Sequence, residues 1–129
     1  MKKGFTLLEL IVVIIIIGIL ATLGFAQYTK VIEKGRMAEA RRILGAIRSA
    51  EESYKQEYDT YSDTFANIAV TAPTACSASH YFTYNVTSLA GNATRCTSGG
   101  KTPSATWGGY VVSVGFANGT LYGNLSGYY

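Results

Sequence analysis

The stretch that decides the fold is GFTLLE, residues 4–9, followed by LIVVIIIIGILATLGFA, residues 10–26. The second segment has seventeen residues, and Thr22 carries its only polar side chain. Counted from Phe5, the stretch contains twenty-two residues, which would form an α-helix about 33 Å long. The hydrocarbon core of a bilayer is about 30 Å thick. The stretch therefore predicts a helix that spans a membrane.

The residues before this helix predict its orientation. Lys2 and Lys3 stand directly in front of it, and basic residues that flank a membrane span favour the cytoplasmic side. We therefore expect the N-terminus in the cytoplasm and the rest of the chain outside.

Glu9 does not fit an ordinary membrane anchor. A carboxylate inside a transmembrane helix costs about 2.5–3.5 kcal/mol even on insertion scales, and no Lys or Arg stands between Lys3 and Lys30. One interpretation is an interfacial acid that reaches the headgroups. The other is a pair with the α-amino group that cleavage before Phe5 would create. In a stack of helices that amine could belong to a neighbouring copy, and the pair would then set the axial register.

Gly4, Phe5, Thr6 and Glu9, preceded by a short basic leader and followed by the apolar run, stand at the spacing of a known family. This pattern closely resembles the class III signal sequence of type IV pilins and type II secretion pseudopilins. The resemblance covers about the first thirty residues strongly and the next thirty by general pattern. It implies cleavage between Gly4 and Phe5 by a prepilin peptidase, N-methylation of Phe5, and Glu9 as the assembly glutamate. It also implies that inner-membrane assembly machinery moves the apolar helix from the membrane into a filament core.

The N-terminal segment departs from the family pattern in one respect and also allows a rival interpretation. Many pilins have a proline near the end of the apolar run, which kinks or locally melts the helix, whereas the first proline of this chain is Pro73. In the rival interpretation Gly24-Phe25-Ala26 is the cleavage site of an ordinary secretory signal peptide. Glu9 inside the apolar run argues against it, and a mature chain that began at Gln27 would establish it.

The segment 27–59 predicts an amphipathic continuation of the helix. Apolar residues recur there at intervals of three or four, which is the pattern of a helix with one buried face. The predicted stripe consists of Ala40, Ile43, Leu44, Ile47, Ala50, Tyr54 and Tyr58. Two pairs of opposite charge four residues apart, Arg48 with Glu52 and Glu51 with Lys55, predict ion pairs on the solvated faces.

The segment 60–129 predicts a loop followed by a small antiparallel sheet. Strand-like runs occupy residues 81–86, 109–116 and 121 to 125 or 128, and residues 91–105 read as a polar loop. Asn118-Gly119 between the last two runs is a strong hairpin signal. The expected fold is α+β: a long N-terminal helix, half transmembrane and half amphipathic, packed on three or four strands. The expected divisions are a leader (1–4), a transmembrane helix (5–26), an amphipathic helix (27–59) and a loop and sheet (60–129) that form a head with 27–59.

Two cysteines stand twenty positions apart, at Cys76 and Cys96. An even number of cysteines in an exported domain favours one disulfide, and here it would bridge the segments on either side of the first strand. Two unpaired, buried thiols are the alternative.

Composition argues against an enzyme. His80 is the only histidine, and no acidic residue follows Asp63, so the sequence shows no cluster typical of a catalytic or metal site and implies no cofactor. The net charge of +3 is not the basic stripe of a nucleic-acid-binding protein.

The expected function is that of a structural subunit of a type IV pilus-like filament, with its own copies as partners. One alternative is a type II secretion pseudopilin. Some major pseudopilins bind calcium through C-terminal acidic residues, which this sequence lacks. The other alternative is a small secreted or anchored binding domain that does not polymerise.

Overall fold

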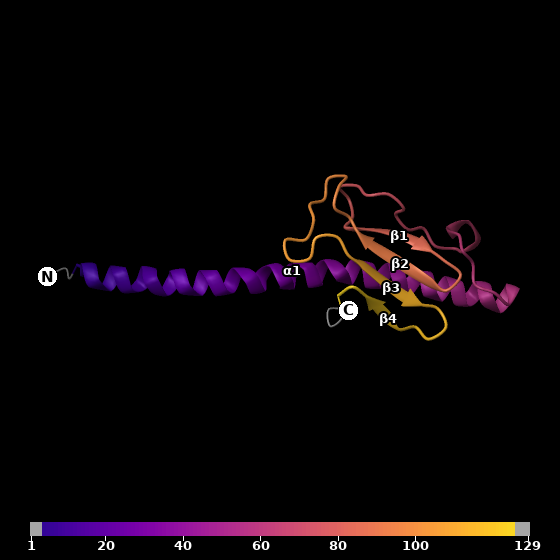
Figure 1. The fold of residues 1–129 in the computed structure, drawn as a ribbon, viewed down its shortest axis with the longest axis horizontal. Helices are drawn as coiled ribbons and strands as arrows, with labels where there is room; N and C mark the ends of the chain where they lie inside the picture. The colour runs from indigo at the N-terminus through magenta and orange to yellow at the C-terminus, as the bar shows by residue number, and fades with distance from the viewer. Residues whose placement is uncertain (1–3, 126–129) are drawn as a thin grey trace. The chain divides into compact units, whose positions relative to one another are not determined.

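The computed structural model describes residues 4–125. Its elements are α1 (Leu7–Tyr58), the short 3-10 helix η1 (Phe65–Asn67), β1 (Phe82–Val86), β2 (Ala90–Arg95), β3 (Val111–Gly115) and β4 (Leu121–Gly123) (Figure 1). The chain divides into two compact units, Met1–Ile32 and Glu33–Tyr129. The second unit is called the head below. The predicted α+β class, with one long N-terminal helix and a small antiparallel sheet, is confirmed.

The first unit consists almost entirely of the apolar part of α1. An 18-residue window of this helix has a mean hydropathy of 2.8, and none of that window is buried in the structure. Among the described residues, α1 is the one helix long and apolar enough to cross a membrane. A helix that is apolar on all sides needs lipid or other helices around it, because no face of it is suited to water.

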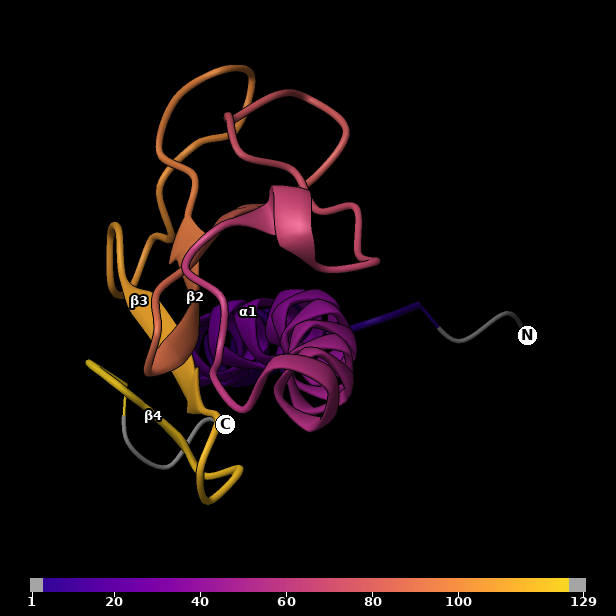
Figure 2. The same ribbon diagram turned by 90° about the vertical axis from the view of Figure 1, so that its right-hand side faces the viewer.

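The head is built from the second part of α1 and a four-stranded sheet. The strands lie in the order β1-β2-β3-β4, and every neighbouring pair is antiparallel. In one row across the sheet Tyr84 pairs with Ala93, Ala93 with Val112, and Val112 with Gly123. Viewed along α1, the strands lie to one side of the helix (Figure 2). The core between helix and sheet contains Met37, Ala40, Leu44, Ile47, Ile68, Phe82, Tyr84, Val86, Ala93, Tyr110, Val112, Val114 and Phe116.

The buried stripe of α1 is shifted from the predicted one. Ala40, Leu44 and Ile47 are fully buried as predicted, and Ile43, Ala50 and Tyr54 are half-buried. Tyr58 is wrong as a core residue: it is 55% exposed, because it is the last residue of α1 and the chain turns away at Asp59. The stripe instead begins earlier and includes Glu33, Met37 and Glu51. The periodicity identified the correct face but could not reveal that an acid lies at each end of it.

The strands confirm three predicted segments and correct one. The runs 81–86, 109–116 and 121–125 contain β1, β3 and β4, whereas the predicted polar loop 91–105 is wrong because it contains most of β2. The extension of the last strand to Tyr128 lies outside the described residues. The Asn118-Gly119 hairpin is confirmed between β3 and β4, with Gly119 at φ 67°.

The composition of β2 explains why its sequence does not resemble a strand. A Cβ on Gly91 would lie 3.0 Å from Cγ2 of Ile47 and 3.6 Å from Cδ2 of Leu44. Glycine therefore lets α1 approach the sheet closely at this point, although glycine weakens an isolated strand. Pairing with β1 on one side and β3 on the other supplies the order that local propensity lacks.

Candidate functional site

The first turn of α1 contains a reciprocal pair of polar side chains. The Thr6 hydroxyl accepts a hydrogen bond from the backbone N–H of Glu9 at 3.2 Å. In return, Oε2 of Glu9 accepts from the backbone N–H of Thr6 at 3.3 Å and from its hydroxyl at 3.2 Å. This arrangement is a capping box, which satisfies two backbone donors that the helix itself cannot pair.

The capping box gives Glu9 a role that we did not deduce from the sequence. The signal was present, because Thr-x-x-Glu directly before an apolar run is the usual signature of this motif. No ion pair between residues 4 and 125 involves Glu9, so Thr6 is its partner within the chain as described. The expected pair between Glu9 and an α-amino group on Phe5 remains a prediction.

Gly4 and Phe5 lie just before α1 and are exposed, Phe5 to 89%. The side chains that follow are exposed as well: Leu7, Leu8, Leu10, Ile11, Val12, Val13, Ile14, Ile15, Ile16, Ile17, Ile19, Leu20, Leu23 and Phe25. Contiguous apolar surface of this extent marks contact with a membrane or with other protein chains. The first unit is thus an apolar helix that begins at a capping box containing one carboxylate.

Comparison with known proteins identifies this arrangement. Residues 1–25 match the family model for the prokaryotic N-terminal methylation motif. Over 91 residues the chain is 38% identical to the type IV major pilin protein PilA of Myxococcus xanthus (strain DK1622), which covers 70% of this chain and 40% of that protein. These matches support a protein of the type IV pilin family.

Other pilin-family relatives give the same result over shorter stretches. The fimbrial protein EcpC of Eikenella corrodens is 36% identical over 72 residues, which is 54% of this chain and 47% of that protein. The type IV major fimbrial protein FimA of Dichelobacter nodosus is 40% identical over 53 residues, or 41% of this chain and 34% of that protein. The chain therefore spans less than half the length of these curated relatives.

The head contains a buried ionic network at the start of the buried stripe of α1. Oε1 of Glu33 accepts hydrogen bonds from Nε of Arg95 at 2.7 Å and from the hydroxyl of Tyr110 at 2.8 Å. Its Oε2 accepts from Nη1 of Arg36 at 2.9 Å. Arg95 also donates to the carbonyl of Cys96. The network links α1 to the end of β2 and to the residue before β3.

The protonation of this network follows from its contacts. Burial by itself would raise the pKa of Glu33, but the hydrogen bonds from Arg95 and Tyr110 and the charge of Arg95 outweigh it and hold that pKa below its usual value. Burial, and then the bond to Glu33, raise the pKa of Tyr110. At neutral pH the network thus contains a carboxylate, two guanidinium groups and a neutral phenol. It is a structural clamp and not a proton-transfer pair.

At the other end of the stripe, Glu51 is fully buried. Its Oε2 accepts a hydrogen bond from the backbone N–H of Ser62 at 2.8 Å, whereas Oε1 has no partner within the described structure. The predicted ion pair between Glu51 and Lys55 is wrong, because Glu51 faces inward and Lys55 donates to the Tyr61 hydroxyl. The predicted pair between Arg48 and Glu52 is confirmed at 3.8 Å.

The environment of Glu51 gives a prediction about pH. Burial, and the charge of Asp63 to a smaller degree, raise the pKa of Glu51 against the effect of the Ser62 hydrogen bond. The folded state then binds this proton more tightly than the unfolded state, so the stabilising contribution is present at low pH and is lost as the pH rises through the raised pKa. We expect Glu51→Gln to increase the free energy of unfolding at pH 7 and to change it little at pH 4.

Urea denaturation of the detergent-solubilised chain at several pH values measures this effect. Glu57→Gln, on the exposed last turn of α1, is the matched control and should follow the wild type. A Glu51→Gln chain with the same pH dependence as the wild type would contradict the assignment.

The predicted disulfide between Cys76 and Cys96 is confirmed, with Cα atoms 5.6 Å apart. Cys96 directly follows β2 and is buried, whereas Cys76 is half-buried in the loop that leads to β1. Gly99 packs over the same loop, where an added Cβ would lie 2.5 Å from the Cys76 carbonyl oxygen. The bond thus ties the loop before β1 to the loop after β2, as the sequence indicated.

The remaining polar candidate, His80, has a local role. One ring nitrogen contacts the Ser77 and Ser79 hydroxyls at 3.2 and 3.0 Å, and the other contacts the Ala75 carbonyl at 2.8 Å. Between residues 4 and 125 there is no group of three or more His, Cys, Asp or Glu side chains that could hold a metal ion. His80 therefore orders the loop before β1.

Proposed function

We propose that this chain is a structural subunit of a type IV pilus-like filament. The observation that carries the proposal is the apolar part of α1, which is exposed on all sides and begins at the Thr6–Glu9 capping box inside a methylation motif. Such a helix suits a membrane before assembly and a bundle of identical helices afterwards. The names of the relatives, a major pilin and fimbrial proteins, support a surface filament over a secretion pseudopilus.

The maturation steps belong to the same proposal. A prepilin peptidase cleaves between Gly4 and Phe5, which the exposed position of both residues before α1 makes accessible. N-methylation of Phe5 follows, and residues 1–4 are lost as a leader. Residues 5–26 then hold the subunit in the inner membrane with a cytoplasmic N-terminus, and 27–59 together with 60–129 form the part outside it. Inner-membrane assembly machinery transfers the subunit into the extracellular filament.

Glu9 sets the register of the filament in this proposal. Cleavage gives Phe5 a charged amine four residues from Glu9, and in a stack of copies the amine of one subunit can pair with the carboxylate of its neighbour. A charge removed from water requires a close partner of opposite charge, since an unpaired charge in an apolar environment is strongly unfavourable. A subunit placed at any other axial height would lose this pair with its neighbour.

The capping box allows the charge of Glu9 to be separated from its helix-capping role. Glu9→Gln keeps a side chain that can reach back to the Thr6 backbone N–H and removes the charge. We expect it to abolish fibres or reduce them severely, at a normal amount of subunit in the membrane. Thr6→Ala is the matched control, because it weakens the cap by about 0.5–2 kcal/mol and keeps the charge, so fibres should persist. Fibres sheared from cells and membrane fractions, both quantified by immunoblot, measure the two effects.

The result that contradicts the role of Glu9 is a Glu9→Gln chain that assembles as the wild type does. N-terminal sequencing of the mature subunit tests processing independently. A sequence that begins at Phe5 supports the proposal, and one that begins at Gln27 contradicts it.

A further inference from the structure

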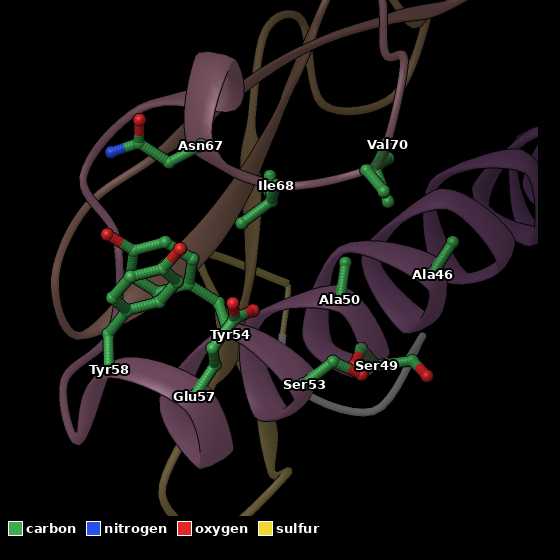
Figure 3. A pocket seen from close by; sticks show the side chains of 11 residues that line it. Ala46, Ser49, Ala50, Ser53, Tyr54, Glu57, Tyr58, Asn67, Ile68 and Val70 are labelled. Carbon is green, nitrogen blue, oxygen red and sulfur yellow. The ribbon is translucent and has the colours of Figure 1, made fainter.

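A groove of about 500 Å³ lies beside the last turns of α1 in the head. One wall is the helix itself, from Ala46 to Tyr58, and the other is the segment from Asn67 to Val70. Figure 3 shows Ala46 and Ala50 on the helical wall, Ile68 and Val70 opposite them, and Tyr54 and Tyr58 side by side at one end. The groove is therefore mostly apolar along its length and aromatic at one end.

The aromatic end of the groove suits a positively charged side chain. The rings of Tyr54 and Tyr58 are stacked with centroids 4.5 Å apart, and Glu57 also lines the groove. Aromatic faces attract guanidinium and ammonium groups, and a carboxylate beside them adds direct charge attraction. The surrounding segment 48–63 contains five acidic and two basic residues, so the field at this end of the head is negative.

The opposite end of the head has the opposite charge. The part of α1 from Glu33 to Arg42 contains four basic and two acidic residues. Lys101, in the loop between β2 and β3, and Arg36 both lie over the Tyr81 ring, at 4.1 and 4.6 Å from its centroid. Arg95 joins the same cluster through Glu33.

The two charged ends are far apart within the head. Arg36 and Glu57 are twenty-one positions apart on one helix, which corresponds to about 32 Å along its axis. Figure 1 shows the loop between β2 and β3 at one end of the sheet and the C-terminal end of α1 beyond the other. A single head therefore cannot neutralise its own ends, whereas a second copy can.

We propose that the groove at the acidic end of one head receives the basic end of the head of a second copy, with a Lys or Arg side chain seated on Tyr54, Glu57 and Tyr58. The two surfaces are different patches of the same chain, so the contact is heterologous, and a heterologous contact that does not close on itself generates an open filament. The inference rests on the proposed filament and names a second contact in it, separate from Glu9.

Charge reversal of one end at a time tests the contact in the full chain. Arg42→Glu/Lys101→Glu makes both ends of the head negative, and Glu57→Lys/Asp63→Lys makes both positive. Each chain expressed alone should give about tenfold fewer sheared fibres or worse, because like charges then face each other across the contact. The two chains expressed together, or all four substitutions in one chain, should restore fibres, because opposite charges meet again. Asn85→Glu and Asn85→Lys, on the exposed face of β1, should assemble as the wild type does.

A mobility shift on reduction of the Cys76–Cys96 bond in the membrane fraction shows that each variant is folded. The inference is overturned if either one-sided variant assembles as the wild type does, or if the four-substitution chain assembles no better than the one-sided variants. Absence of fibres from the wild-type chain would instead refute the proposed function, so the two failures are distinguishable.

Discussion

Replacement of Arg95 by methionine is expected to lower the free energy of unfolding of the head by about 3–5 kcal/mol, the usual penalty for breaking a buried ion pair. Arg95 is fully buried, and its Nε lies 2.7 Å from Glu33. Methionine fills a similar volume but leaves the carboxylate of Glu33 without its buried cation. Arg36 remains, but its side chain is 30% exposed and it contacts the other carboxylate oxygen.

The double variant Glu33→Gln/Arg95→Met is the control that separates charge from packing. It removes both buried charges and keeps an acceptor for the Tyr110 hydroxyl, so most of the lost stability should return. Equal losses in the single and double variants would show that the packing of Arg95, and not its charge, is what matters. Urea denaturation monitored by circular dichroism provides the measurement.

The same network has a defined dependence on pH. Because the pKa of Glu33 is held below its usual value, its contribution to stability is present above that usual value and is lost as the pH falls through the lowered one. The difference between the wild type and Arg95→Met should therefore shrink in acid. This direction is opposite to that expected for Glu51, which distinguishes the two buried acids.

Loss of the Cys76–Cys96 disulfide is expected to destabilise the head by about 3 kcal/mol, the chain-entropy value for a loop of this size. The bond closes a loop of twenty positions that contains β1 and β2. Without the bond, the unfolded chain regains the conformational freedom of that loop. In the folded head, the covalent link between the loop before β1 and the loop after β2 is lost. Cys76→Ser/Cys96→Ser should show this loss in urea denaturation.

Reduction of the wild-type chain is the matched control for the disulfide. Wild type in reductant should unfold at the urea concentration of the double serine variant, and reductant should not change that variant further. A free energy of unfolding that changes neither on reduction nor in the double serine variant would contradict the assigned role of the bond. The helical signal of the first unit should persist in every case, because neither cysteine belongs to that unit.

Much of this architecture was predictable from local patterns. The unbroken apolar run predicted the first unit because length and hydropathy are properties of sequence alone. Asn118-Gly119 predicted its hairpin because few residue pairs adopt the backbone of a tight turn. The spacing of Gly4, Phe5 and Glu9 indicated the family. Thr6 and Glu9 together form the Thr-x-x-Glu signature of a capping box, which is also a local pattern.

Other features depend on contacts between residues distant in the chain. Residues 90–95 form a strand because β1 and β3 pair with them and because Gly91 lets Ile47 and Leu44 approach. The sequence shows Glu33 and Glu51 as two charges among many on a helix. Only the sheet brings Arg95 to Glu33, and only the loop after α1 brings the Ser62 backbone to Glu51.

The sequence by itself thus determined the apolar helix, the N-terminal methylation motif and the cysteine pair. The tertiary structure decided which charges are buried, where the fourth strand lies, and that the head has an acidic groove at one end and a basic cluster at the other. The physical reason is that hydropathy and turn preference act over a few neighbouring residues. Burial and charge pairing depend on which distant segments meet, and in the head they meet across sixty-two positions between Glu33 and Arg95.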